Sequence, residues 1–403
     1  MPPPTPAQLL ALAQERVPLF LDDLTQVCAI DSGSYDRDGV NAMVDWCGER
    51  FAKADLAVER VGHQPVAGGT PLGDLLIGRR TGRRLADAGG RRLLLLAHCD
   101  TVYEAGTAAA RPVRIDGDRV IGPGVTDDKG GLLTGLHALE LLDAAGWTEH
   151  AGVVFTCSPD EELGSPFSRP YLEDLARQSD AGFCLECGRE NGDIVSSRKG
   201  IVELIVDIVG RAAHAGVEPE RGHSAALEAA HKTVEMQALN GRWPGVTVNV
   251  GVLRSGTRPN MVAERAELHV DVRATHREEL DEALRAVDAI VERSWVAGTV
   301  ATSRRGATHA PMEPTPQIAA LVDVVRAVAG ELGFAVDAAS TGGAADANTV
   351  AAVGLPVIDG LGPIGGDDHS PDEWLALSSI APRMALLAGV LARVGAGDGP
   401  IGG

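Results

Sequence analysis

The sequence predicts an α/β protein that carries a second, inserted domain. Near both ends of the chain, short apolar runs typical of buried strands alternate with helical segments, which indicates a mostly parallel or mixed sheet covered by helices. The middle of the chain instead follows the order βαββαβ, which is that of a ferredoxin-like α+β unit. At 403 residues the chain is long enough for one to three domains and for a core that needs no disulfides.

The outer parts supply the elements of the main sheet and its cover. Residues 7–30 and 40–55 predict amphipathic helices, and residues 126–145 place their leucines on one helical stripe that ends at Gly146. Apolar runs without alternation indicate strands that are buried on both faces. These runs are 91–97, 152–157, 181–186 and 353–361.

The middle of the chain predicts a compact insert. Its expected strands are 201–209, 246–253, 266–274 and 299–305, and its expected helices are 222–239 and 276–294. The third strand alternates apolar and polar residues, as in a sheet with one solvated face. We therefore expect a discontinuous catalytic domain, residues 1–198 and 310–403, with a dimerisation or lid domain inserted at 199–309.

Composition excludes several classes of function. The chain has 36 basic and 56 acidic residues, a net charge of -20, which argues against binding nucleic acid or an anionic membrane and favours multivalent cations. Its uninterrupted apolar runs, such as Leu93–Ala97, are far shorter than the roughly 20 residues that cross a bilayer. No secretory signal is visible and six cysteines are too sparse for a disulfide framework, so we expect a cytoplasmic protein.

Five segments could carry chemistry, and most of them also have a simpler interpretation. His98 and Asp100 follow the run 91–97 and would project to the same side of an extended segment, as a metal ligand and its carboxylate partner do. The alternative is a polar turn. Asp127 and Asp128 stand where a glycine-rich loop enters a helix, and either could be only its N-cap.

The other three segments also follow predicted strands. The acids 160–162 come after strand 152–157, where they could be a solvated loop or a metal ligand beside a base. Glu186 ends an apolar stretch, where an unpaired carboxylate is costly. Cys184 and Cys187 flank it as a CxxC pair without a second pair at zinc-ribbon spacing, which favours buried thiols. His369 follows the last predicted strand.

The combination is more specific than any one segment. Each of these side chains follows a predicted strand or strand-loop, and none is inside a helix. Ligands of open α/β sheets gather at the carboxyl ends of strands. Two histidines and several carboxylates at that edge suit a pair of zinc or similar ions with a bridging carboxylate.

With these motifs the chain resembles the di-zinc metallopeptidase family that includes glutamate carboxypeptidase, aminoacylase, acetylornithine deacetylase and succinyl-diaminopimelate desuccinylase. The resemblance extends from about residue 20 to 395. It is closest to the bacterial folate-hydrolysing glutamate carboxypeptidases, through HCDTVY (98–103), IGPGVTDDKGG (121–131), SPDEELGS (158–165) and STGGAAD (340–346).

The resemblance implies a role for each residue. Asp127 would bridge two zinc ions, for which cobalt or manganese could substitute, and its peptide bond to Asp128 would be cis. The remaining roles follow the family: metal ligands His98 and Glu186 on one ion and Glu162 and His369 on the other, general base Glu161, positioning partner Asp100, oxyanion donor His214, and substrate-binding residues Asn260, Arg273, Gly342 and Gly343.

The expected reaction is hydrolysis of an amide by a metal-activated water, with Glu161 moving the proton and Arg273 binding the carboxylate of the released amino acid. The expected partners are a small peptide or N-acyl amino acid and a second copy of the chain, bound through the insert. Glutamate as the released residue stays open, because Arg304 and Arg305 do not align with the subgroup's basic residue without a gap. An N-acyl-amino-acid deacylase, a dipeptidase and a catalytically silent metal-dependent binding protein are the alternatives.

Overall fold

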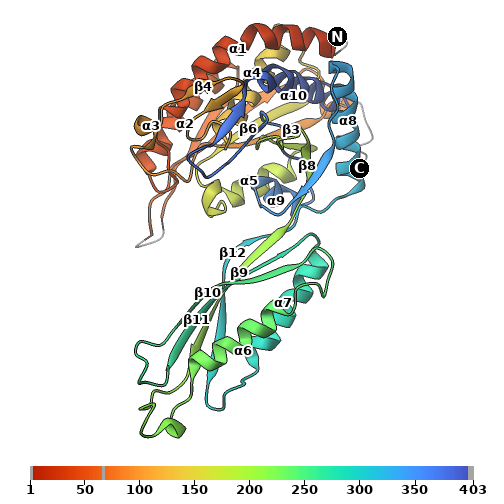
Figure 1. Ribbon diagram of the computed structural model, residues 1–403. Coiled ribbons are helices and arrows are strands. Elements are labelled where there is room, and N and C mark those ends of the chain that lie inside the picture. Colours follow the sequence, from red (N-terminus) through yellow and green to blue (C-terminus); the bar gives the residue numbers. More distant parts are fainter. Residues whose placement is uncertain (1–2, 66–68, 398–403) are drawn as a thin grey trace. The chain divides into compact units, whose positions relative to one another are not determined.

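The computed structural model describes residues 3–65 and 69–397, which form two compact units (Figure 1). The first unit contains the described residues up to Ser196 together with Pro314–Ser340 and the residues from Ala345 onward. The second, which we call the inserted unit, contains Ser197–Glu313 and Thr341–Ala344.

The first unit is built on a mixed six-stranded sheet in the order β1-β2-β6-β3-β7-β14. Strand β2 pairs antiparallel with both of its neighbours, whereas β6, β3, β7 and β14 are parallel. The mixed α/β sheet confirms the expected fold class, although the edge strand β1 and its neighbour β2 were not predicted and the expected strand 353–361 is reduced to two residues. The strands are β1 (Ala57–Val61), β2 (Leu75–Thr81), β3 (Arg92–His98), β6 (Gly152–Ser158), β7 (Ala181–Cys184) and β14 (Val357–Ile358).

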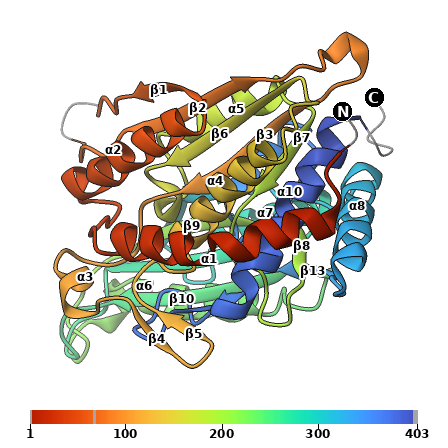
Figure 2. The same ribbon diagram turned by 90° about the horizontal axis from the view of Figure 1, so that it is seen from above.

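Helices cover both faces of this sheet (Figures 1 and 2). On one face, Phe155 of β6 stacks on Phe51 of α2, and a Cβ at Gly135 of α4 would lie 2.5 Å from the same ring, so both helices pack there. The helices of that face are α1 (Pro6–Cys28), α2 (Arg37–Lys53), α4 (Lys129–Ala144), α8 (Pro316–Leu332) and α10 (Ile380–Gly395), and those of the other face are α5 (Arg169–Arg177) and α9 (Asp346–Ala351).

Local sequence explains where several of these helices begin. Thr5 accepts a hydrogen bond from the backbone N–H of Gln8 at the start of α1, and Asp36 accepts one from Gly39 at the start of α2. A small sheet extends the unit, with β15 (Gly365–Gly366), β16 (Trp374–Ala376), β5 (Arg119–Ile121) and β4 (Arg114–Asp116) in that order, next to the short helix α3 (Thr107–Ala110).

One segment is long and apolar enough to cross a membrane by composition alone. It comprises Leu377–Gly395, and 78% of its apolar window is buried inside the protein. The segment contains no uninterrupted apolar run of membrane-spanning length, because Arg383 and Arg393 divide it. Burial at this level identifies α10 as a helix of the protein core.

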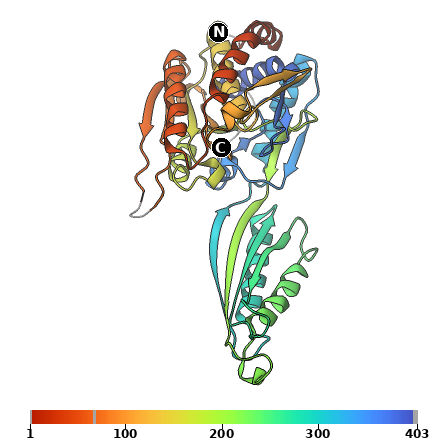
Figure 3. The same ribbon diagram turned by 60° about the vertical axis from the view of Figure 1, so that its left-hand side comes forward.

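The inserted unit has the predicted βαββαβ order (Figure 3). Its strands pair antiparallel in the order β10-β11-β9-β12, and both helices cover one face. Alternate residues of β9 and β11 are buried beneath these helices, which is why the sequence alternates. The elements are β9 (Gly200–Val209), α6 (Ala225–Gln237), β10 (Thr247–Ser255), β11 (Arg265–Ala274), α7 (Arg277–Glu292) and β12 (Val300–His309).

A short stretch from the end of the chain belongs to the inserted unit. Thr341–Ala344 lies within the part expected to be catalytic domain, 310–403. Its Thr341 carbonyl accepts a hydrogen bond of 3.0 Å from the backbone N–H of Lys199. The strands β8 (Ile194–Arg198) and β13 (Ala338–Thr341) pair next to it.

A buried histidine makes the first unit sensitive to acid. His150 is 1% exposed and its ring centre lies 5.6 Å from that of Trp147. Burial, with a smaller contribution from Arg80, lowers the pKa of His150 from 6.5 to about 4. Above pH 6.5 this residue is neutral whether the chain is folded or not, and between pH 6.5 and 4 only the unfolded chain takes up the proton. The free energy of unfolding should therefore fall by about 3 kcal/mol over this range on account of His150 alone.

Urea unfolding of the wild type and of His150→Phe, followed from pH 7 to pH 4, checks this prediction. The variant lacks the titrating ring, so the difference in unfolding free energy between the two proteins should change between pH 6.5 and 4. Two parallel curves would show that His150 does not contribute to the acid sensitivity.

Candidate metal centre

Chemically active side chains follow three neighbouring strands of the main sheet. His98 is the last residue of β3, Glu161 and Glu162 follow β6, and Glu186 follows β7. Strand β3 lies between β6 and β7 and is parallel to both, so their carboxyl ends meet at one edge. The two adjacent glutamates were expected outside helices, but Glu161–Leu163 forms a single turn of 3-10 helix.

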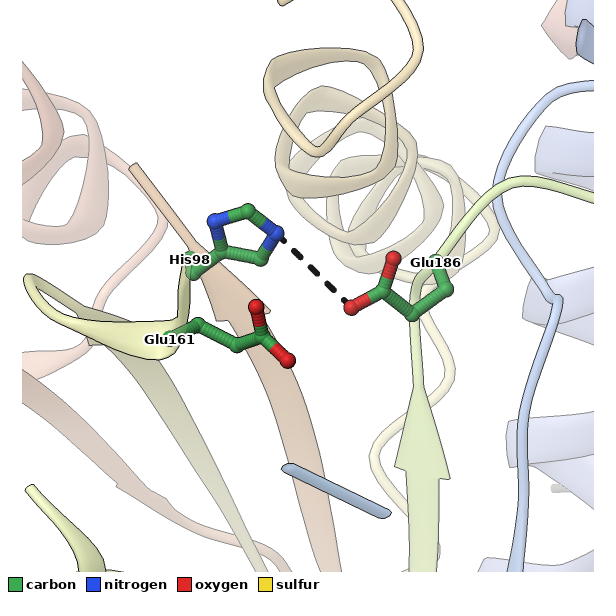
Figure 4. A group of neighbouring side chains, drawn as sticks. All are labelled: His98, Glu161 and Glu186. Carbon is green, nitrogen blue, oxygen red and sulfur yellow. Dashed lines mark ion pairs between the residues drawn. The ribbon is translucent and has the colours of Figure 1, made fainter. Parts of the chain in front are cut away.

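His98, Glu161 and Glu186 form the first of two groups that could hold a cation (Figure 4). One potential ligand atom from each residue lies within 4.8 Å of the others. The Nε2 atom of His98 is 3.7 Å from Oε1 of Glu186. The carboxylate of Glu161 therefore lies next to any cation that His98 and Glu186 would bind.

The second group consists of Asp127, Glu162 and His369, whose potential ligand atoms also lie within 4.8 Å of one another. The Nε2 atom of His369 is 3.1 Å from Oδ2 of Asp127 and 3.1 Å from Oε2 of Glu162. His369 comes from the loop between β15 and β16, so this group joins parts of the chain that are 242 residues apart.

Asp127 links the two groups. Its Oδ1 atom lies 2.9 Å from Nε2 of His98, while its Oδ2 atom faces His369 at 3.1 Å. Each oxygen of one carboxylate is thus directed at a different histidine, which is the arrangement that a carboxylate shared by two cations requires. The peptide bond from Asp127 to Asp128 is cis, as the resemblance implies.

Burial and mutual repulsion dominate the electrostatics of the centre. Burial raises the pKa of Glu161 well above its ordinary value, and it also raises the pKa of Glu162. Hydrogen bonds to Asp127 and Glu162 raise the pKa of His369 to about 11. Burial acts to lower the pKa of His98, but its bonds to Asp100 and Asp127 outweigh that effect and raise it well above 6.5.

The residues present fit a pair of cations. Among the described residues, the buried atoms Glu162 Oε1 and Asp128 Oδ1 have no hydrogen-bond partner, a state that costs free energy unless a cation or water satisfies the oxygen. Imidazole nitrogens and carboxylate oxygens are also a donor set that suits zinc. The two groups contain more carboxylates than histidines, and bound cations would neutralise the resulting negative charge.

Asp100 holds more of the centre together than the sequence indicated. It was expected to support His98, and its Oδ1 atom lies 3.3 Å from Nδ1 of that ring. Its carboxylate also accepts hydrogen bonds from the backbone N–H groups of Glu161 and Glu162, at 3.1 and 3.2 Å, and from the hydroxyl of Ser34 at 2.7 Å. One buried carboxylate therefore fixes both the histidine and the turn with the two glutamates.

The inserted unit carries the other expected site residues in two separate places. His214 pairs with Met261, and the carbonyl of Asn260 accepts a hydrogen bond of 3.1 Å from Ala215, so His214 and Asn260 are neighbours. The Nδ1 atom of His214 accepts a bond of 3.1 Å from the N–H of Gly216, which leaves the proton of this exposed ring on Nε2.

Arg273 lies at the other end of the same sheet. It pairs with Ile201 at the beginning of β9, whereas His214 follows the end of β9. Arg273 forms two hydrogen bonds to Asp271, of 2.8 and 3.1 Å, and its Nη1 atom donates a bond of 2.8 Å to the carbonyl of Gly342. The carbonyl of Gly343 likewise accepts a hydrogen bond from an arginine, Arg198, at 3.2 Å.

Two buried acids near the centre were not assigned a role by the sequence. The carboxylate of Asp160 accepts hydrogen bonds from the N–H groups of Phe167 and Ser168, at 2.6 and 3.3 Å, and closes the loop after Glu161 and Glu162. Burial raises the pKa of Asp160 to about 6. Glu373 contacts the loop before Asp127. Both lie in acidic stretches that look like solvated loops, so composition alone offers no signal for them.

Known proteins resemble this chain in sequence and in fold. The model of peptidase family M20/M25/M40 matches residues 94–393. Carboxypeptidase G2 of Pseudomonas sp. (strain RS-16) is 29% identical over 395 residues, which cover 96% of this chain and 92% of the relative. Acetylornithine deacetylase of Aliivibrio salmonicida (strain LFI1238) is 27% identical over 313 residues, 73% of this chain and 79% of the relative.

A solved structure shows the same fold. Aminopeptidase PepT from Bacillus cereus ATCC 10987 superimposes with a TM-score of 0.76 at 21% identity and covers 94% of this chain and 98% of its own. The family model matches well over half of the chain and includes every residue of the two groups described above. The chain therefore belongs to peptidase family M20/M25/M40.

Proposed function

We propose that this protein is a zinc-dependent hydrolase that cleaves an amide bond and releases a C-terminal amino acid. The observation that carries the proposal is the position of Asp127, whose two oxygens face His98 and His369. The reaction class is supported by the chain's membership in a peptidase family and by its similarity to carboxypeptidase G2.

The two groups suggest how the ions would be held. His98 and Glu186 would bind one ion, Glu162 and His369 the other, and Asp127 would bind both. The nitrogen and carboxylate donors favour zinc, and cobalt or manganese could replace it. Asp100 would keep His98 in the tautomer and orientation that a ligand needs.

The protein's own groups would carry the proton transfers. Bound zinc would supply an activated water by lowering its pKa from that of bulk water to about 7. Glu161 would accept a proton from that water and return it to the leaving amine. The buried position of Glu161, which raises its pKa, suits a carboxylate that must hold a proton briefly near neutral pH.

The inserted unit would recognise the released amino acid. The guanidinium of Arg273 would attract the free carboxylate, next to the backbone of Gly342 and Gly343. Asn260 would contribute to the same recognition. The identity of the side chain stays open, and glutamate, as in the folate-hydrolysing subgroup that the sequence resembles, is the first candidate.

A second copy of the chain would complete the site. The β9 residues from Ile201, opposite Arg273, to Val209 span about 26 Å at 3.3 Å per residue, and His214 lies beyond that end. A dipeptide is about 7 Å long, so one substrate cannot contact Arg273 and His214 of the same chain. We infer that His214 and Asn260 serve the active site of the partner in a homodimer.

The surface of the inserted unit supports such a dimer. Strand β10 has a neighbour on one side only among the described strands, so its other edge can pair with a second copy. Exposed apolar side chains lie nearby on and after the helices, with Leu227 52%, Val234 70% and Trp295 48% exposed. Helix α6 packs on β10, and two of these side chains belong to α6.

A hydrolysis screen tests the proposed function. The protein is stripped with a chelator, reloaded with zinc, and offered dipeptides, N-acyl amino acids and N-aroyl glutamates, with and without a blocked α-carboxylate. We expect zinc-dependent release of the C-terminal amino acid and no cleavage when that carboxylate is amidated.

The alternatives give different results in the same screen. Dependence on a short acyl group with little dependence on the amino acid would favour a deacylase, and cleavage restricted to free dipeptides would favour a dipeptidase. A protein that binds two ions and hydrolyses nothing would be a binding protein. The cytoplasmic location stays a prediction, supported by six cysteines that are all free thiols.

A further inference from the structure

We propose that Glu373 is a positioning residue for the metal centre, which fixes the loop of Asp127 and ties it to the loop of His369. The proposal depends on the function proposed above only because it takes zinc as the ion that the residues of these loops bind. Glu373 is not itself placed among the metal ligands, and its side chain is 1% exposed.

The carboxylate of Glu373 accepts hydrogen bonds from the backbone of the loop that ends at Asp127. Its Oε1 atom accepts hydrogen bonds from the N–H groups of Thr126 and Asp127, at 2.9 and 3.2 Å. Its Oε2 atom accepts one of 2.8 Å from the N–H of Gly124, which has a φ of +73°. Three donors within four residues thus converge on one side chain, so the loop cannot shift without breaking these bonds.

Tyr103 links Glu373 to the part of the β15–β16 loop that carries His369. Its hydroxyl lies 2.7 Å from Oε2 of Glu373 and 2.9 Å from the carbonyl of Ser370, and its single hydrogen can be donated to either acceptor. Ser370 follows His369 directly, and Arg111 also donates a bond of 3.3 Å to the Ser370 carbonyl. Glu373 and Tyr103 therefore connect the segments that carry Asp127 and His369.

The chemistry of the donors requires a carboxylate at this position. All four partners of the side chain are hydrogen-bond donors, and each carboxylate oxygen faces two of them. A glutamine would turn an NH₂ group toward at least one N–H donor, which loses a bond and adds a repulsive contact. The side chain of Glu373 is therefore specified by charge as well as by length.

The experiment measures zinc binding rather than catalysis. Chelator-stripped wild type, Glu373→Gln and the control Asp372→Asn are titrated with zinc against a chromophoric competitor, and thermal unfolding is recorded with and without zinc. Asp372 is the preceding, exposed carboxylate of the same loop. We expect Glu373→Gln to need 10–100-fold more free zinc for half-occupancy of both sites, because losing a partner that orients ligands typically has this effect. Asp372→Asn should match the wild type.

The remaining outcomes either support or overturn the proposal. If Glu373→Gln lowers the melting temperature equally with and without zinc and keeps its zinc affinity, Glu373 is only a structural residue. If Glu373→Gln does not fold, Tyr103→Phe replaces it, and a several-fold loss of zinc affinity supports the proposal whereas an unchanged affinity overturns it. A wild-type protein that binds no zinc would overturn the proposed function as well, so the two failures are distinguishable.

Discussion

Glu161→Gln should abolish turnover while both zinc ions remain bound. The substitution keeps the size of the side chain and removes the group proposed to accept the proton of the attacking water. General-base catalysis typically contributes 10²–10⁴-fold, so kcat should fall by at least two orders of magnitude. Steady-state kinetics together with metal analysis of the purified variant measures both effects.

The neighbouring residue provides a matched control. Glu162→Gln alters the same turn, and its side chain faces His369 at 3.1 Å in the second group. This variant should lose zinc as well as activity. A Glu161→Gln protein that keeps more than a tenth of the wild-type kcat, or that loses its zinc as readily as Glu162→Gln, would contradict the assignment of Glu161 as the base.

His214→Ala should lower kcat by about 10²–10³-fold, the usual effect of losing one donor to an oxyanion. The hydrogen bond from Gly216 to Nδ1 leaves the ring proton on Nε2, where it can be donated. The ring is exposed and outside both metal groups, so zinc content and melting temperature should stay unchanged.

A mixed dimer separates action across the dimer from action within one chain. His214→Ala and Glu161→Gln are each inactive, and they are refolded together so that heterodimers form. If His214 serves the partner, one of the two sites in each heterodimer receives both an intact base and an intact histidine, and activity returns. Heterodimers confirmed by mass that stay inactive would show that His214 acts in its own chain or not in catalysis.

Much of the candidate metal centre could be predicted because strand ends have a fixed geometry. His98, Glu161 and Glu186 follow buried parallel strands, and such strands bring their carboxyl ends to one edge. The inserted unit was also predictable, since its alternation and element order are local properties of the sequence. In both cases the pattern along the chain reflects burial directly.

The features that were missed have no such pattern. Strand β1 is exposed over nearly its whole length, so it lacks an apolar run. Glu373 follows a proline and an aspartate in a stretch typical of a solvated turn, and only the three-dimensional structure brings its donors together. Thr341–Ala344 joins the inserted unit through backbone and arginine contacts, which four residues of sequence cannot indicate.

Arg273 and His214 lie at opposite ends of one sheet, so the length of its strands sets the distance between these two residues. Adding two residues to both β9 and β11 would keep every side chain on its face and move the far end outward by about 7 Å. Adding one residue would turn the alternating side chains to the opposite face. Variation in the length of these strands is therefore restricted to steps of two, and each step changes the reach of His214 by about the length of a dipeptide.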